Sequence, residues 1–202
     1  MPGRRGLFSL AAACAMPRLV RAHDAHDPAP RPASSEAVIR LRSPLPDVRV
    51  TDAQRRRRRL VSEVFAGRVV AIDFVLTDCA SFCTVISAAM AGAQEMLGPR
   101  LSREVGLVSL ALDPIGGTPD ELKAYAHRFS AGPGWDFVNI PPAPLDNVLR
   151  GIGGPVSGGD HTPMVLVLDT ARGEIRRILG IPEPEAIVRT IDAALSARRA
   201  QA

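Results

Sequence analysis

Long apolar segments are scarce in this sequence, and their scarcity bears on how the chain relates to a membrane. The apolar run near the N-terminus covers residues 7–16 and is closed by Pro17. Its ten residues are about half of the ~20 that a membrane-spanning helix requires. We therefore expect no permanent membrane helix here. The position of the run behind Arg4 and Arg5 instead predicts an export signal over residues 1–22.

The signal carries two further features. Arg4 and Arg5 precede Leu7 and Phe8, an arrangement similar to a twin-arginine signal, so we predict export to the periplasm. Cys14 follows three alanines and is a weaker alternative, as the acceptor of a lipid anchor. We favour its removal with the signal, and we expect contact with a membrane only through peripheral or lipid attachment.

Acidic residues are missing from the first 22 positions, although four arginines lie there. The whole chain has 25 basic and 21 acidic residues, a net charge of +4, so the signal accounts for the excess. A nucleic-acid-binding protein needs a basic stripe on the folded domain itself, and we expect no nucleic-acid partner. The arginine run over residues 55–59 is interpreted as a solvated turn, with docking to an acidic partner or to lipid headgroups as the alternative.

Cysteine is scarce as well, with three in 202 residues. Removal of Cys14 leaves Cys79 and Cys83, in a compartment where disulfides can form. Any thiol chemistry of the mature chain therefore rests on this pair.

Internal repeats are also lacking, and the composition indicates one globular domain. Hydrophobic residues make up 46% of the chain and charged residues 23%, which are ordinary values for a chain with a real core. We place the domain at residues 46–198 and a short tail at 199–202. Residues 23–45 are rich in Pro, Ala, Asp and Arg without an apolar period, so we predict a flexible lead-in.

Apolar periodicity predicts an α/β fold. Residues 69–75 and 105–112 are near-continuous apolar runs, typical of strands covered on both faces. Thr118 is followed by Pro119 and then by Glu121, the pattern of a capping box at a helix start. Further elements are predicted at 48–59 (a hairpin), 82–97 (a helix), 164–168 and 174–179 (paired strands) and 187–195 (a helix). This order is that of a thioredoxin-like fold, a central mixed sheet flanked by helices with an N-terminal hairpin.

The spacing of Cys79 and Cys83 places both thiols at one site. At a strand-to-helix junction, residues four apart lie one helical turn apart, with Cβ atoms ~5–6 Å from each other. The pair can therefore share a metal ion or close a disulfide. The N-terminus of the helix favours thiolates over thiols. A purely stabilising disulfide is the plainer alternative, but a bridge that closes so short a loop adds little stability.

Four segments of the chain together resemble the Sco/SenC family. A buried strand runs into a threonine and a CxxxC motif, and a second strand ends in Asp-Pro ahead of a Thr-Pro helix start. A glycine-tryptophan turn follows, and an Asp-His-Thr triplet precedes the penultimate strand. These segments are residues 69–83, 109–119, 132–135 and 160–162, and the resemblance extends over about residues 46–194.

The resemblance implies a copper site made by Cys79, Cys83 and His161. Two thiolates suit Cu(I), and a neutral imidazole also serves Cu(II). Sco proteins help to deliver copper to the CuA centre of cytochrome c oxidase. The implied partner is accordingly the oxidase subunit that carries CuA, or another copper or thiol protein, and the implied role is that of an assembly factor rather than an enzyme.

Pro163 adds a prediction about the backbone. Thioredoxin-like proteins usually set a cis-proline opposite the dithiol, shortly before a strand that ends in Asp. Pro163 stands six residues ahead of Asp169, and cis bonds are essentially confined to X-Pro. We therefore predict a cis bond between Thr162 and Pro163.

The chain departs from the family pattern around the cysteines. Ala80, Ser81 and Thr84 stand where the motif commonly has proline, an acid and proline, and Gly117 replaces the family's second acid after Asp-Pro. These changes leave the ligands in place but affect the surface beside them. They keep open an alternative function, that of a periplasmic thiol-disulfide oxidoreductase acting on the cysteines of a target.

Overall fold

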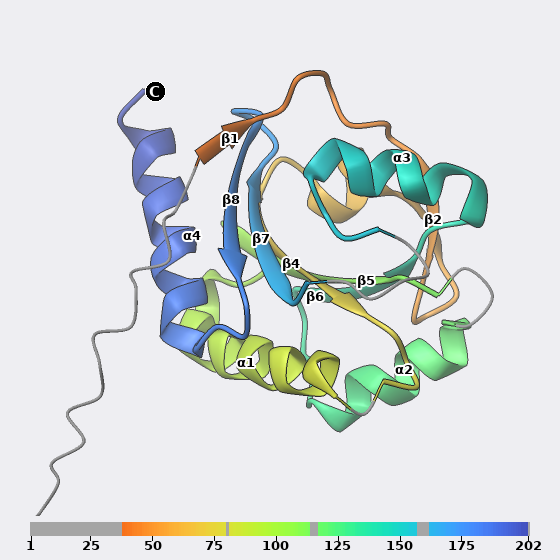
Figure 1. Cartoon of the computed structure of the whole chain (residues 1–202). Coiled ribbons are helices and arrows are strands. Elements are labelled where there is room, and N and C mark those ends of the chain that lie inside the picture. Colours follow the sequence, from red (N-terminus) through yellow and green to blue (C-terminus); the bar gives the residue numbers. More distant parts are fainter. Residues whose placement is uncertain (1–37, 80, 114–116, 157–161, 202) are drawn as a thin grey trace, which may run out of the picture. The chain divides into compact units, whose positions relative to one another are not determined.

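A single mixed sheet organises the part of the chain that the computed structural model describes, which is residues 38–79, 81–113, 117–156 and 162–201. The strand order is β1-β8-β7-β4-β5-β6-β2-β3 (Figure 1). The strands are β1 (Val38–Arg40), β2 (Arg49–Asp52), β3 (Arg57–Arg59), β4 (Val69–Val75), β5 (Val105–Ala111), β6 (Trp135–Asn139), β7 (Met164–Asp169) and β8 (Glu174–Leu179). The helices are α1 (Phe82–Leu97), α2 (Pro119–Arg128), α3 (Pro142–Ile152) and α4 (Pro184–Arg199), with a π-helical turn η1 (Leu60–Phe65) and a 3-10 turn η2 (Gly98–Arg100).

β4 and β5 form the centre of the sheet. Every residue of both strands is buried, and they pair in parallel from Val69 opposite Val105 to Val75 opposite Ala111. β7 pairs antiparallel with the other side of β4. The sequence prediction of two strands covered on both faces is confirmed, because helices lie on each side.

The two faces of β4 belong to different cores. Val69, Ala71 and Val75 pack with residues of α1, α2 and α4, whereas Val70 and Ile72 pack with residues of η1 and α3. Figure 1 shows the corresponding layers, with α1, α2 and α4 on one face of the sheet and α3 on the other. The predicted thioredoxin-like arrangement of a mixed sheet flanked by helices is present.

The start of α2 is the capping box predicted from the sequence. The Thr118 hydroxyl accepts a hydrogen bond from the Glu121 amide, and the Glu121 carboxylate accepts one from the Thr118 amide at 2.8 Å. Pro119 occupies the first turn, where its missing N–H costs nothing. This fixes the start of α2, the helix that packs beside the cysteine-bearing loop.

The hairpin of β2 and β3 is confirmed, but two elements near it in the sequence were missed. β1 pairs antiparallel with β8 inside the segment predicted as a lead-in. Its three residues are exposed, so it has no apolar period to reveal it. η1 buries Leu60, Val64 and Phe65 directly after the hairpin.

The prediction of a cis bond between Thr162 and Pro163 is wrong. Both residues are described, and none of the described peptide bonds is cis. The Pro163 carbonyl accepts a hydrogen bond from the Gly180 amide at 2.7 Å, which continues the pairing of β7 with β8. Trans is the intrinsically favoured isomer of X-Pro, and a cis bond forms only where the surroundings outweigh that preference.

The helices of the described residues are too short or too polar to cross a membrane. The export signal predicted for residues 1–22 lies outside the described residues.

Candidate metal centre

Cys79 and Cys83 lie where the sequence placed them, between β4 and the start of α1. The Cys79 amide donates to the Leu76 carbonyl at 3.0 Å, and the Thr84 hydroxyl donates to the Cys79 carbonyl at 3.1 Å. Cys83 is in the first turn of α1. These bonds hold the loop that carries Cys79 against the helix that carries Cys83.

The two thiols differ in exposure. Cys79 is half-buried, whereas Cys83 is fully buried, and both are free thiols in this structure. A reactant from solvent therefore meets Cys79 first.

Cys79 favours the thiolate. Partial burial alone raises the pKa of Cys79, but hydrogen bonding by the Ser81 side chain, the interaction with the Cys83 thiol and the amides of both residues outweigh this effect and lower the pKa to about 7. The Ser81 hydroxyl lies 3.2 Å from the Cys79 sulfur. The amides belong to the start of α1, so the expected effect of the helix N-terminus is confirmed for Cys79.

Cys83 favours the thiol. Burial raises the pKa of Cys83 to about 12, and the neighbouring Cys79 and Asp73 act in the same direction. The expectation that the helix N-terminus would make both cysteines thiolates is therefore wrong for Cys83, because desolvation of a buried sulfur outweighs the helix effect.

A buried carboxyl lies behind the pair, and the sequence reading missed it. Asp73 of β4 is completely buried and accepts hydrogen bonds from the Ser109 hydroxyl at 2.6 Å and the Ser87 hydroxyl at 3.1 Å. Burial raises the pKa of Asp73 to about 6, although the two hydroxyls lower it. Ser87 lies one turn beyond Cys83 on α1, which connects this network to the dithiol. The sequence does contain a signal for this buried carboxyl, because Asp73 is the one charged residue within the apolar run of residues 69–75.

The network continues to the aromatic residues of the same core. The Ser87 hydroxyl lies 3.0 Å from the Tyr125 hydroxyl, and the Trp135 indole donates to the Ser109 hydroxyl at 2.9 Å. The tryptophan of the glycine-tryptophan turn thus has a hydrogen-bonding role besides packing.

α2 contacts the loop that carries Cys79. The Arg128 guanidinium lies over the Tyr125 ring, 4.5 Å from its centroid, and donates to the Thr77 carbonyl at 3.2 Å. The position of the loop is therefore coupled to α2 and, through Tyr125, to the buried network.

His161, the third predicted ligand, lies outside the described residues, as does Ala80. Thr162 and Pro163 follow His161 and lead into β7. Because β7 runs antiparallel to β4, the first residues of β7 lie beside the last residues of β4. Within the described part of the chain no three His, Cys, Asp or Glu side chains are grouped to hold a metal ion.

The fold and the dithiol define the class of protein: a thioredoxin-like domain with two cysteines at the start of its first long helix. Over residues 51–133 the chain matches the family model described as SCO1/SenC. The resemblance read from the sequence is therefore confirmed over these residues. This segment contains both cysteines and ends before His161.

A sequence relative supports the same assignment. A protein of Bacillus subtilis (strain 168), described as a SCO1 protein homolog, is 30% identical over 77 residues, which are 38% of this chain and 39% of that protein. The chain thus matches well under half of the length of this relative.

Two solved structures share the fold. BsSco, described as a member of the Sco family of cytochrome c oxidase assembly proteins and as having a disulfide switch, superposes with a TM-score of 0.63 at 19% identity, covering 77% of this chain and 95% of that one. ScoI of Bradyrhizobium japonicum, solved with copper bound, superposes with a TM-score of 0.60 at 19% identity, covering 75% and 99%. The predicted thioredoxin-like α/β fold is confirmed by this similarity.

Proposed function

We propose that the chain is an exported copper-binding protein whose ligands are Cys79, Cys83 and His161. The observation that carries the proposal is the pair of free thiols between β4 and α1, close enough for each to shift the pKa of the other. Sulfur donors suit Cu(I), and a neutral imidazole extends the site to Cu(II). Copper bound in this way could be transferred to another protein that offers soft ligands.

The protein groups have distinct tasks in this proposal. Cys79 is the first donor, because it is the more exposed sulfur and its pKa of about 7 makes it a thiolate near neutral pH. Cys83 becomes a donor only after it loses its proton, since its pKa is raised to about 12 in the free protein. Copper uptake is therefore expected to release a proton from Cys83.

We propose that the recipient is the CuA-bearing subunit of cytochrome c oxidase, or another copper or thiol protein. The matched segment over residues 51–133 and the descriptions of BsSco and ScoI support this assignment. The place of action is the periplasm, reached by the export signal in residues 1–22.

A specific observation favours a second candidate, a thiol-disulfide oxidoreductase. An exposed sulfur with a lowered pKa beside a buried sulfur with a raised one is suited to stepwise exchange. The Cys79 thiolate attacks a target disulfide, forming a mixed disulfide and releasing one target thiolate. Cys83, after losing its proton to solvent, attacks the Cys79 sulfur, which closes the Cys79–Cys83 disulfide and releases the second target thiolate.

The two candidates separate in an anaerobic Cu(I) titration of the reduced mature protein. We expect one copper per monomer in the wild type, and at least tenfold weaker binding in Cys79→Ser, Cys83→Ser and His161→Ala. His127→Ala, which removes an exposed histidine of α2, is the matched control and should bind like the wild type. Wild-type binding no tighter than that of the cysteine variants, together with copper-independent reduction of insulin disulfides, would favour the oxidoreductase.

A further inference from the structure

A pocket of about 330 Å³ lies on the far side of the sheet from α1. Its wall is formed by β1 and the residues after it, by the C-terminal end of α3 and by β8. Four arginines line it, namely Arg40, Arg42, Arg150 and Arg177, and none of the described residues that line it is Asp or Glu. This volume is at the lower end of the range for small-molecule sites.

Three of the four arginines of this pocket lack the acidic partners that other arginines of the protein have. Arg40 lies 3.5 Å from Glu174. Arg42, Arg150 and Arg177 make no ion pair with any residue in the described ranges. Three guanidinium groups without a nearby carboxylate leave a strongly positive cavity.

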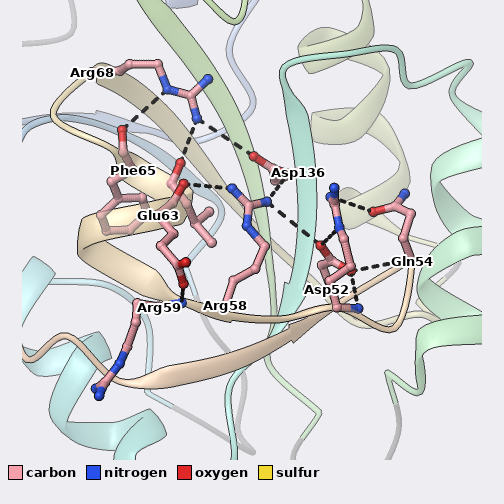
Figure 2. A network of polar contacts seen from close by, with 10 residues as sticks. Asp52, Gln54, Arg58, Arg59, Glu63, Phe65, Arg68 and Asp136 are labelled. Carbon is pink, nitrogen blue, oxygen red and sulfur yellow. Dashed lines mark hydrogen bonds and ion pairs between the residues drawn. The ribbon is translucent and has the colours of Figure 1, made fainter.

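The β2–β3 hairpin shows the contrasting arrangement (Figure 2). Arg58 pairs with Asp136 at 2.7 Å and also approaches Asp52, which Arg56 contacts at 2.7 Å. Arg55 pairs with Asp120. Three members of the arginine run therefore form ion pairs, and Arg59 donates to the Asp47 carbonyl at 2.8 Å. The run is neither wholly solvated nor wholly free for docking.

Arg177 is the fixed member of the pocket. Its Nη2 donates to the Gly153 carbonyl at 2.8 Å, and its Nε is buried without a hydrogen-bond partner. Gly153 has φ 64°, and a Cβ there would collide with the Arg177 guanidinium. A glycine at this position thus allows both the left-handed turn after α3 and the close approach of a charged group.

The helix end does not account for this much positive charge. The C-terminus of α3 carries roughly half a negative elementary charge, and a cation beside it is stabilising. Arg177 alone more than offsets that partial charge through its bond to Gly153. The positive charges of Arg42 and Arg150 remain unbalanced, so we expect the pocket to attract an anion from solution.

The rest of the lining indicates what kind of anion fits. Ile39, Leu41, Ile152 and Ile175 contribute apolar side chains to the same pocket. Guanidinium groups bind phosphate in a bidentate manner, and a dianion matches several of them better than a monoanion does. We propose that this pocket binds a small phosphate monoester, with the phosphate among the arginines and its apolar group on the isoleucine side.

Phenyl phosphate is the probe that tests the proposal, in calorimetric titrations of the full mature protein. We expect saturable binding that weakens at least tenfold in the double variant Arg42→Gln/Arg150→Gln, which changes two exposed side chains and leaves Arg177 in place. The matched control is Arg49→Gln/Arg57→Gln, which removes the same charge from the hairpin and should bind within about twofold of the wild type. Inorganic phosphate should bind more weakly than phenyl phosphate, because it lacks the apolar group.

Three outcomes would overturn the proposal. Absence of saturable binding would leave the arginines as solvated charges. Equal losses in the pocket and hairpin variants would indicate nonspecific charge attraction. Tighter binding of benzoate than of phenyl phosphate would exclude phosphate as the preferred group. The site is separate from the dithiol, so Cys79→Ser should leave phenyl phosphate binding unchanged whichever function the cysteines have.

Discussion

The division of labour between Cys79 and Cys83 arises from their immediate surroundings. Both cysteines are near the start of α1, yet only Cys79 has the Ser81 hydroxyl beside its sulfur. Ser81 is the N-cap residue of α1, but its side chain makes no capping hydrogen bond. The Ser81 hydroxyl, which at an N-cap would ordinarily accept a hydrogen bond from a helix amide, instead forms a hydrogen bond with the Cys79 sulfur.

Alkylation by iodoacetamide should report this asymmetry directly. Because only the thiolate reacts, modification of Cys79 should rise with a midpoint near pH 7, while Cys83 should remain unmodified up to pH 9. Both cysteines lie in one tryptic peptide, residues 69–100, so fragmentation of this peptide in the mass spectrometer is used to assign each modification to Cys79 or Cys83.

Ser81→Ala should move the Cys79 midpoint upward by roughly one pH unit, because a hydrogen bond to a charged group is worth ~1.5 kcal/mol. Ser62→Ala removes a hydroxyl that donates to Asp47, away from the cysteines, and should leave the midpoint unchanged. A common midpoint for Cys79 and Cys83 would contradict the assignment of Cys79 as the reactive sulfur.

Among the elements, the turn before β6 is under the tightest steric constraint. Gly134 has φ 93°, and a Cβ there would lie 2.7 Å from the Leu101 side chain and 2.8 Å from the Ser102 amide nitrogen. The turn therefore brings β6 against the segment after η2, and Trp135 follows at once to donate into the buried network.

Gly134→Ala should lower the free energy of unfolding by about 2 to 4 kcal/mol, because left-handed strain and a backbone clash act together. Gly67→Ala is the matched control. Gly67 also has positive φ, 71°, but a Cβ there meets nothing within 4 Å, so only the strain of roughly 1 kcal/mol remains. Urea denaturation measures both, and equal losses would show that the contact with Ser102 gives way easily.

At the scale of the whole molecule, Asp73 makes stability depend on pH. The fold holds the pKa of Asp73 at about 6, above its ordinary value of 3.8, so the folded protein binds this proton more tightly than the unfolded chain. Stability from this residue is complete below pH 4 and is lost as pH rises through 6, by about 3 kcal/mol for a shift of about two pKa units.

Asp73→Asn should remove that loss. The variant should be about 2 kcal/mol more stable than the wild type at pH 7.5, after allowance for weaker bonds to Ser87 and Ser109, and no more stable at pH 4. Asp120→Asn changes an exposed carboxylate and should alter stability little at either pH. A wild-type pH profile retained in Asp73→Asn would locate the titrating group elsewhere.

The sequence predicts the main secondary-structure elements of this molecule well, because the sequence patterns that indicate them are local. The continuous apolar runs of β4 and β5, the capping box at Thr118 and the cysteine spacing each depend on neighbouring residues alone. The pKa of Cys83, the surroundings of Asp73 and the arginine-lined pocket depend on residues brought together by the fold. β1 depends on pairing with β8, and no periodicity within three exposed residues indicates it.

The two outermost strands of the sheet bear on how the protein behaves in concentrated solution. β1 and β3 are each three residues long, and both contain arginine. An edge strand of this length offers few free backbone groups to another chain, and its charges repel a second copy of the same edge. The short, charged strands β1 and β3 thus protect both edges of the sheet against edge-to-edge aggregation.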